Sequence, residues 1–167
     1  MNQINKISKI IIYLMFVITL SGCKIYYHVA PISLWINGLK SEDENVRMEV
    51  AEVLSTKKTR KFLPELISSL VDKNRIVRGF CVISIGNLGE SAEPAVPALI
   101  QLLENETDHI NRCSICVTLS EIKEKAKDAI PILIKILEIE DEKLKLFSAL
   151  AFSLISESVT HIEHRLI

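Results

Sequence analysis

A short pattern that returns at a nearly constant spacing limits the possible folds of this chain more than any other feature. Pro64-Glu-Leu-Ile returns as Pro97-Ala-Leu-Ile after 33 residues and as Pro131-Ile-Leu-Ile after a further 34. Self-similarity at such a period is typical of solenoids, in which each unit buries its apolar face only against its neighbours. We therefore predict an all-α chain of stacked helix pairs.

Two polar columns mark the second helix of each pair. The first consists of Asp43, Asn74, Asp108 and Asp141, and the second, four residues later, of Arg47, Arg78, Arg112 and Lys145. Asp and Asn are preferred at helix N-caps, because their side chains accept hydrogen bonds from the free N–H groups of the first turn. The first column therefore predicts four helix starts.

The basic column has two interpretations. Each basic side chain can hold the capping residue of its own or of an adjacent unit, which would form a ladder along the stack. Alternatively, the column can face a ligand. Because the acidic and basic columns run in parallel and balance each other, we favour the ladder.

The three recurring prolines predict the starts of the first helices, because a proline at the first helical position gives up no backbone hydrogen bond. In the first pair Pro31 lies two residues early, so this terminal unit is atypical. The tail 157–167 resembles the start of a fifth unit cut short, and we expect it to cover the open end. The expected bounds of the four pairs are 32–40 and 44–56, 64–71 and 75–88, 96–104 and 109–122, and 130–139 and 142–156.

Three segments carry a more specific pattern: Val77-Arg78, Ile85-Gly86-Asn87-Leu88-Gly89 and the run from Gly89 to Leu99. They resemble HEAT repeats, and more narrowly the short repeats shared with phycobilisome lyase-like proteins. The third unit departs from this pattern at Lys123, where a Gly is expected. Over 31–167 the resemblance implies a HEAT-like α-α superhelix of about four antiparallel helix pairs, right-handed and with the second helices on its concave side.

The resemblance restricts function only loosely, because this fold hosts scaffolds, adaptors and a few lyase subunits. We expect a non-enzymatic scaffold or adaptor that binds a protein partner. The alternative is a lyase- or chaperone-type subunit that handles a small apolar ligand. Because the lyase branch acts on a pigment of cytoplasmic antenna proteins, an export signal would argue against this alternative.

The N-terminal segment has the features of such a signal. Two lysines precede an apolar run of eleven residues, Ile10–Leu20, which is shorter than the roughly 20 residues of a membrane-spanning helix. Leu20-Ser21-Gly22-Cys23 then resembles the lipobox of bacterial lipoproteins. The resemblance implies removal of residues 1–22 and acylation of Cys23. An uncleaved signal anchor with an incidental Cys is the alternative.

These features predict a lipoprotein signal peptide over 1–22, a lipidated tether over 23–30 and a repeat domain over 31–167. Two or more acyl chains hold a protein stably on a membrane. We therefore expect a lipid-anchored protein of the bacterial cell envelope that faces away from the cytoplasm. Lys24 stands where an Asp would resemble an inner-membrane retention signal, so the outer membrane is the expected address if the host has one.

Neither composition nor motifs indicate nucleic-acid binding or catalysis. With a formal net charge of −1, the chain lacks the excess of Lys and Arg typical of nucleic-acid binding. It has no Gly-rich phosphate loop and no G-x-S-x-G motif. Acidic clusters at Glu42-Asp43-Glu44 and Glu140-Asp141-Glu142 open helices, where negative charge complements the helix dipole. We expect no catalytic residue and no cofactor.

Two short Cys and His motifs are expected to be structural. Cys113 and Cys116 form a C-x-x-C beyond the first turn of a predicted helix, whereas redox motifs of this type lie at a helix N-terminus. We expect two small hydrophobic residues here, and Cys81 makes the number of thiols in the exported domain odd. His161 and His164 offer two ligands, fewer than a metal site needs, so we expect no metal.

An apolar face on the second helices is the feature that points to a partner. The residues after the basic column are Met48, Gly79, Cys113 and Leu146, and four residues later stand Glu52, Ile83, Val117 and Leu150. Related repeats carry polar residues there. The groove that we predict for an apolar helix or tail of a protein partner is lined by Ile83, Val117, Leu146 and Leu150. The alternative is that tight curvature or the tail 157–167 buries them as core.

Overall fold

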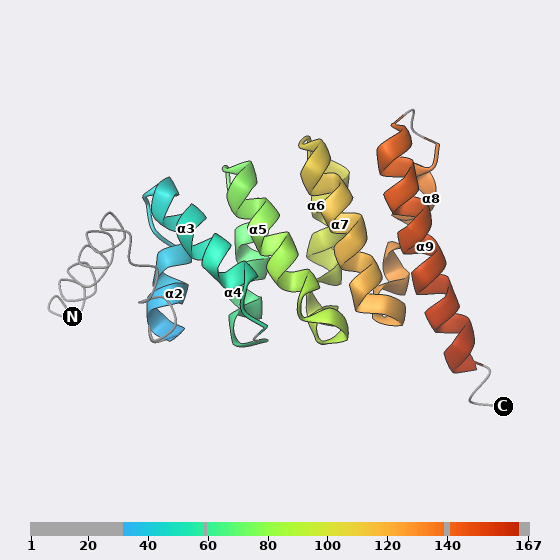
Figure 1. The fold of residues 1–167 in the computed structure, drawn as a ribbon, viewed down its shortest axis with the longest axis horizontal. Coiled ribbons are helices and arrows are strands. Elements are labelled where there is room, and N and C mark those ends of the chain that lie inside the picture. The colour runs from blue at the N-terminus through green and yellow to red at the C-terminus, as the bar shows by residue number, and fades with distance from the viewer. Residues whose placement is uncertain (1–31, 59, 139–140, 164–167) are drawn as a thin grey trace, which may run out of the picture.

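The computed structural model describes residues 32–58, 60–138 and 141–163, with side chains from 35 to 160 within these ranges. These residues form an all-α solenoid, and Figure 1 shows its helix pairs side by side along the long axis. We number the pairs units 1 to 4. In chain order they comprise α2 (Ile32–Leu39) and α3 (Glu44–Ser55), α4 (Leu63–Ser68) and α5 (Arg75–Gly86), α6 (Val96–Asn105) and α7 (His109–Ile122), and α8 (Ile130–Ile136) and α9 (Glu142–Glu163).

The N-caps predicted from the sequence are confirmed. Each capping side chain accepts a hydrogen bond from a backbone N–H two or three residues later, at 2.7–3.0 Å. The pairs are Asp43 with Asn45, Asn74 with Ile76, Asp108 with Asn111, and Asp141 with Leu144. The recurring prolines lie in the first turns of α4, α6 and α8, as expected.

Short 3-10 turns, which the sequence did not predict, join the helices: η2 (Arg60–Phe62), η3 (Ser69–Val71), η4 (Gly89–Ala95) and η5 (Lys123–Ala129). Both η4 and η5 begin at a residue with positive φ, 56° at Gly89 and 57° at Lys123. This conformation favours glycine, because a Cβ atom is strained there. The third unit therefore keeps the turn of the second although Lys123 replaces the glycine.

The second helices form one continuous layer. α3 packs against α5, α5 against α7 and α7 against α9, and in Figure 1 these helices lie in front of α4, α6 and α8. The core lies between the two layers, where Ile85, Leu119 and Leu133 are completely buried. Burial of one such side chain contributes about 1.5–3 kcal/mol. One face of the second helices thus packs in the core and the opposite face is left for other contacts.

The last helix is longer than predicted. Because α9 runs from Glu142 to Glu163, residues 157–163 continue this helix, and the expectation that they begin a fifth unit is wrong. The physical reason is that neither Gly nor Pro interrupts the sequence of α9. Residues 164–167 lie outside the described residues.

The predicted signal peptide over 1–22, the lipidated Cys23 and the tether over 23–30 also lie outside the described residues. Within the described ranges, the structure contains no helix that is both long and apolar enough to cross a membrane.

Candidate protein-binding face

The four residues predicted to bind a partner are exposed on neighbouring second helices. Ile83 lies on α5, Val117 on α7, and Leu146 and Leu150 on α9, and each is between 41% and 58% exposed. The alternative in which curvature or the tail buries them as core is therefore wrong for the described structure. Their role in binding stays a prediction.

Three further exposed apolar residues extend this surface, and sequence reasoning missed them: Ile76 on α5, Ile110 on α7 and Leu154 on α9. Each lies four or seven residues from a predicted residue of the same helix, and this spacing returns to the same helix face. The spacing was the signal that could have found them. We call these three residues together with Ile83, Val117, Leu146 and Leu150 the apolar row.

A hollow of about 700 Å³ opens beside α5, α7 and α9. Its apolar lining includes Ile83, Ile110, Val117 and Phe147, and its charged lining consists of Lys58, Glu121 and Lys143. The structure thus brings Ile83 and Val117 to one hollow, whereas Leu146 and Leu150 do not line it. Its volume lies in the range of about 300–1,000 Å³ that is usual for ligand pockets.

The cysteines that the structure describes, Cys81, Cys113 and Cys116, are free and buried. Burial raises the pKa of Cys81 and of Cys116 to about 12, and it also raises the pKa of Cys113. The thiolate is the reactive form, so thiols with a raised pKa are poor nucleophiles near neutral pH. The C-x-x-C motif therefore packs as the two small hydrophobic residues that the sequence predicted.

His109 lies beside Cys113, but the arrangement is not that of a catalytic triad. Its Nδ1 atom is 3.6 Å from Sγ of Cys113 and 3.4 Å from Oδ2 of Asp141. In a triad the nucleophile and the carboxylate contact different ring nitrogens, so that one nitrogen takes the proton while the other is held. Here both neighbours face the same nitrogen.

No metal cluster is found among the described residues, where no three His, Cys, Asp or Glu side chains gather around a common point. The predicted His161 and His164 lie outside the described side chains. In the first acidic cluster, Asp43 caps α3 and Glu44 accepts a hydrogen bond from Asn74 at 2.6 Å. These carboxylates therefore have structural partners.

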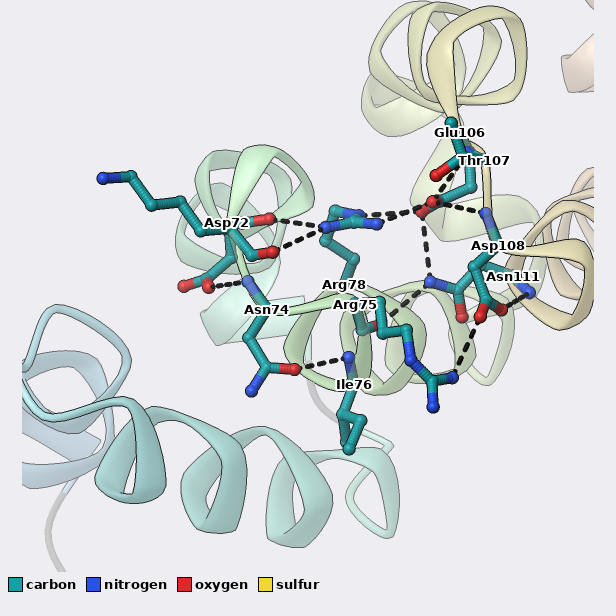
Figure 2. Close-up of polar contacts among 10 residues, drawn as sticks. Asp72, Asn74, Arg75, Ile76, Arg78, Glu106, Thr107, Asp108 and Asn111 are labelled. Carbon is teal, nitrogen blue, oxygen red and sulfur yellow. Dashed lines mark hydrogen bonds and ion pairs between the residues drawn. The ribbon is translucent and has the colours of Figure 1, made fainter.

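Two members of the basic column, Arg47 and Arg78, form ion pairs between neighbouring units, so the predicted ladder is present in part. Nε and Nη2 of Arg47 donate to the two carboxylate oxygens of Asp72, at 2.6 and 3.2 Å. Nε and Nη2 of Arg78 donate in the same way to Glu106, at 2.7 and 2.6 Å, as Figure 2 shows. In both cases Nη1 donates to two backbone carbonyls before the arginine's own helix. We call these two pairs the Arg ladder.

The acidic partners in the Arg ladder are not the capping residues, which corrects the prediction. Asp72 and Glu106 each stand two residues before the N-cap of the next unit, and sequence reasoning missed them although this shared position was visible. The N-cap residues of units 2, 3 and 4 instead contact the first helical residue of the preceding unit's second helix. These contacts are Glu44 with Asn74 at 2.6 Å, Arg75 with Asp108 at 2.9 Å, and His109 with Asp141 at 3.4 Å.

The electrostatics of the Arg ladder follow from its burial. The Glu106 carboxylate is completely buried, and burial alone would raise its pKa. Hydrogen bonds from Arg78 and from neighbouring amide groups outweigh that effect and lower the pKa of Glu106 to about 2. The same competition, with Arg47 as the partner, lowers the pKa of Asp72. Such carboxylates stay charged at neutral pH because they are paired.

The Arg ladder does not continue into unit 4. Lys145 on α9 donates to Glu142, one turn earlier in the same helix, at 3.1 Å. Arg112 on α7 forms no ion pair with any described residue. The first two interfaces between units are therefore each joined by a partly buried arginine–carboxylate pair, and the third is not.

Comparisons with known proteins agree with this architecture. The family model described as HEAT repeats matches residues 32–112. HEAT repeats generally mediate protein interactions, which supports a protein partner. No curated protein matches the sequence.

Among solved structures, the crystal structure of an engineered protein is similar to this solenoid, with a TM-score of 0.61 and 18% sequence identity. The match covers 75% of this chain and 62% of the engineered protein. At this identity the likeness shows the fold alone. HEAT repeat solenoids are typically non-enzymatic scaffolds.

Proposed function

We propose that this chain is a membrane-anchored, non-enzymatic scaffold or adaptor that binds a protein partner through the apolar row. The exposure of the apolar row carries this proposal, because its large apolar side chains face solvent on three helices that pack side by side. Extended apolar surface of this kind usually marks an interaction site. Repeat solenoids commonly bind partners on one face of the stack.

The chemistry of the face favours an apolar helix or tail that carries an acidic residue beside its apolar side. The apolar row supplies the surface for the apolar side, and the hollow has room for a bulky side chain. Lys58 and Lys143 line the hollow with a single carboxylate, Glu121, so its lining carries an excess of positive charge. Opposite charge on a partner adds to the rate and specificity of binding.

The apolar row can be tested by placing charges on it. Val117→Asp combined with Leu150→Asp should leave a folded, helical protein, because both residues are already largely exposed. Co-purification of partner proteins from the native membrane, quantified by mass spectrometry, should fall to background. The matched control is Val71→Asp combined with Ile134→Asp, which changes two exposed apolar residues outside the apolar row and should retain the partner.

Two outcomes would contradict the proposal. If the row variant keeps its partner as well as the control does, the apolar row is not the binding surface. If the row variant unfolds while the control stays folded, the two side chains are needed for folding, and the apolar row is not a free binding surface.

The membrane anchor rests on the sequence of the N-terminal segment. The lipobox pattern Leu20-Ser21-Gly22-Cys23 supports acylation of Cys23 and a place in the bacterial cell envelope, on the outer membrane if the host has one. Mass spectrometry of the membrane fraction should find Cys23 as the first residue with its thiol acylated. Cys23→Ala should accumulate as an unmodified precursor. An intact Met1 or a free Cys23 thiol in the native protein would contradict the anchor.

The size of the hollow favours a second candidate function, binding of a small apolar ligand by a lyase- or chaperone-type subunit. Native mass spectrometry of protein purified from its host would show a bound small molecule in that case. Val117→Asp should remove it, because Val117 lines the hollow. Under the scaffold proposal the purified protein has no added mass, and only protein partners are lost in the row variant.

A further inference from the structure

The side chain of Arg112 lacks the partner that its position in the repeat calls for. Like Arg47 and Arg78, it stands four residues after a capping Asp or Asn, here in the first turns of α7. Its Nε atom is completely buried and has no hydrogen-bond partner. Buried N–H groups in native proteins nearly always have an acceptor, because an unpaired one is costly. The geometry therefore indicates a missing acceptor.

The sequence explains why the residue at the corresponding position of the repeat does not pair with Arg112. In the Arg ladder the carboxylate stands two residues before the N-cap of the next unit, at Asp72 and at Glu106. The same position before Asp141 is Ile139, which offers no acceptor. Among the described residues, the third interface therefore keeps the arginine of this repeat position without a paired carboxylate.

A pocket of about 380 Å³ opens at Arg112 between units 3 and 4. Its lining consists of Arg112 and Lys135, of Glu104 and Glu138, and of three aliphatic side chains that include Ile132. Neither of these two glutamates pairs with Arg112 in the described structure.

The corresponding place between units 2 and 3 provides an internal comparison. There a pocket of about 500 Å³ is lined by Arg78 together with Asp72 and Glu106, and Glu106 completes the hydrogen bonds of Arg78. Both pockets thus contain an arginine at the same position of the repeat, Arg78 in one and Arg112 in the other. They differ in whether the chain itself supplies the carboxylate.

We propose that Arg112 binds an acidic side chain supplied by a protein partner, which completes the Arg ladder from outside the chain. This inference rests on the proposed function in that it requires a protein partner, but it uses a surface other than the apolar row. Arginine recognises a carboxylate with two parallel hydrogen bonds, as Arg47 does with Asp72.

The rest of the pocket narrows the chemistry of the ligand. Lys135 adds a second positive charge, while Glu104 and Glu138 oppose a dianion such as phosphate more strongly than a carboxylate with one charge. The aliphatic lining, which includes Ile132, fits an apolar residue next to the acidic one. The ligand is therefore an Asp or Glu flanked by aliphatic residues.

A pair of short peptides tests this proposal on the full chain. The probes are acetyl-Leu-Asp-Leu-amide and its neutral match, acetyl-Leu-Asn-Leu-amide, and the readout is the ¹⁵N NMR signals of the arginine Nε–H groups. The Asp peptide should shift the signal of Arg112 and leave those of Arg47 and Arg78 in place, because these are already paired. The Asn peptide should shift none of them. Acetate at equal concentration should also have no effect.

Several results would overturn the proposal. The absence of a shift at Arg112 with the Asp peptide, or an equal shift with the Asn peptide, shows that Arg112 is not a carboxylate site. An equal shift with acetate assigns the site to free small carboxylates and rules out the need for a protein source.

Two variants separate this site from a merely structural arginine. Ile139→Asp should raise the temperature of unfolding, move the Arg112 signal to the region of Arg47 and Arg78 without peptide, and weaken peptide binding at least about tenfold. Arg78→Gln should lower the temperature of unfolding and leave the peptide response of Arg112 intact. If Ile139→Asp changes neither the signal nor the peptide affinity, the proposal is wrong.

Failure of this site and failure of the proposed function remain distinguishable. Val117→Asp with Leu150→Asp should still show the peptide response at Arg112, because the pocket at Arg112 contains no residue of the apolar row. Loss of the native partner in that variant with an intact peptide response supports both surfaces. An absent peptide response in a protein that still binds its partner through the apolar row rejects the Arg112 site alone.

Discussion

At the scale of single residues, Glu106 shows how a charge is kept inside the stack. Its carboxylate accepts hydrogen bonds from Arg78, from the backbone N–H groups of Thr107 and Asp108, and from the Asn111 amide. A buried charge is stable only when its hydrogen-bonding capacity is used, and here four groups share that task. One ionised side chain therefore links Arg78 of unit 2 to three residues of unit 3.

We expect the protein to lose stability in acid as Glu106 takes up a proton. The pKa of Glu106 lies at about 2 in the folded protein, below its usual value of 4.5. Its contribution is therefore fully present above pH 4.5 and is lost as the pH falls toward 2. The complete loss corresponds to about 3 kcal/mol in the free energy of unfolding. Urea unfolding at a series of pH values measures this change.

Glu106→Gln keeps the shape of the side chain and removes its charge. The free energy of unfolding of this variant should therefore depend less on pH between about 2 and 4.5. Glu93→Gln, at an exposed residue outside the Arg ladder, is the control and should follow the native protein. If the free energy of unfolding of Glu106→Gln changes with pH as that of the native protein does, the pair of Glu106 with Arg78 does not control stability in acid.

At the scale of helices, α5 and α7 approach closely where α5 carries a glycine. A Cβ atom on Gly79 would lie 2.6 Å from Oδ1 of Asn111. Asn111 cannot easily give way, because its Nδ2 donates to the carbonyl of Arg75 at 2.9 Å and to Glu106 at 3.1 Å. The contact between these helices therefore depends on the absence of a side chain at position 79.

Gly79→Ala should therefore destabilise the protein by about 1–3 kcal/mol through overpacking, although alanine favours a helix by about 1 kcal/mol over glycine. Urea unfolding of Gly79→Ala, Asn111→Ala and the double variant measures the coupling between the two positions. The double variant should cost less than the sum of the single ones, because the truncated residue 111 leaves room for the new methyl group. Strictly additive costs would rule out this contact as the cause.

At the scale of the whole molecule, the helix starts could be predicted because each depends on a local signal. A capping residue or a proline acts within one helical turn, so neither needs knowledge of the fold. The partners in the Arg ladder could not be found in this way, since Arg47 and Asp72 lie 25 residues apart and Arg78 and Glu106 lie 28 apart. Their pairing becomes visible only once the units are stacked.

The candidate binding face was predictable to a similar extent. Repeat columns identified Ile83, Val117, Leu146 and Leu150, because apolar residues stood where related repeats are polar. The columns could not show that Ile83 and Val117 share a hollow with Phe147, which depends on how α9 packs on α7. They also could not show that Cys113, in the same column as Leu146, is buried. Packing decides these outcomes, and packing is not local.

The Arg ladder also makes the stack directional. Each link joins an arginine of one unit to an acid that precedes the second helix of the next. A second copy placed on the outer side of unit 4 would need an arginine at this position of α9, but the residue there is Lys145, which lacks the planar group that donates two parallel hydrogen bonds to a carboxylate. The contact that sets the register inside one molecule is thus not offered to another at this side. This arginine–carboxylate contact therefore does not stabilise a fibre that grows by head-to-tail addition of copies.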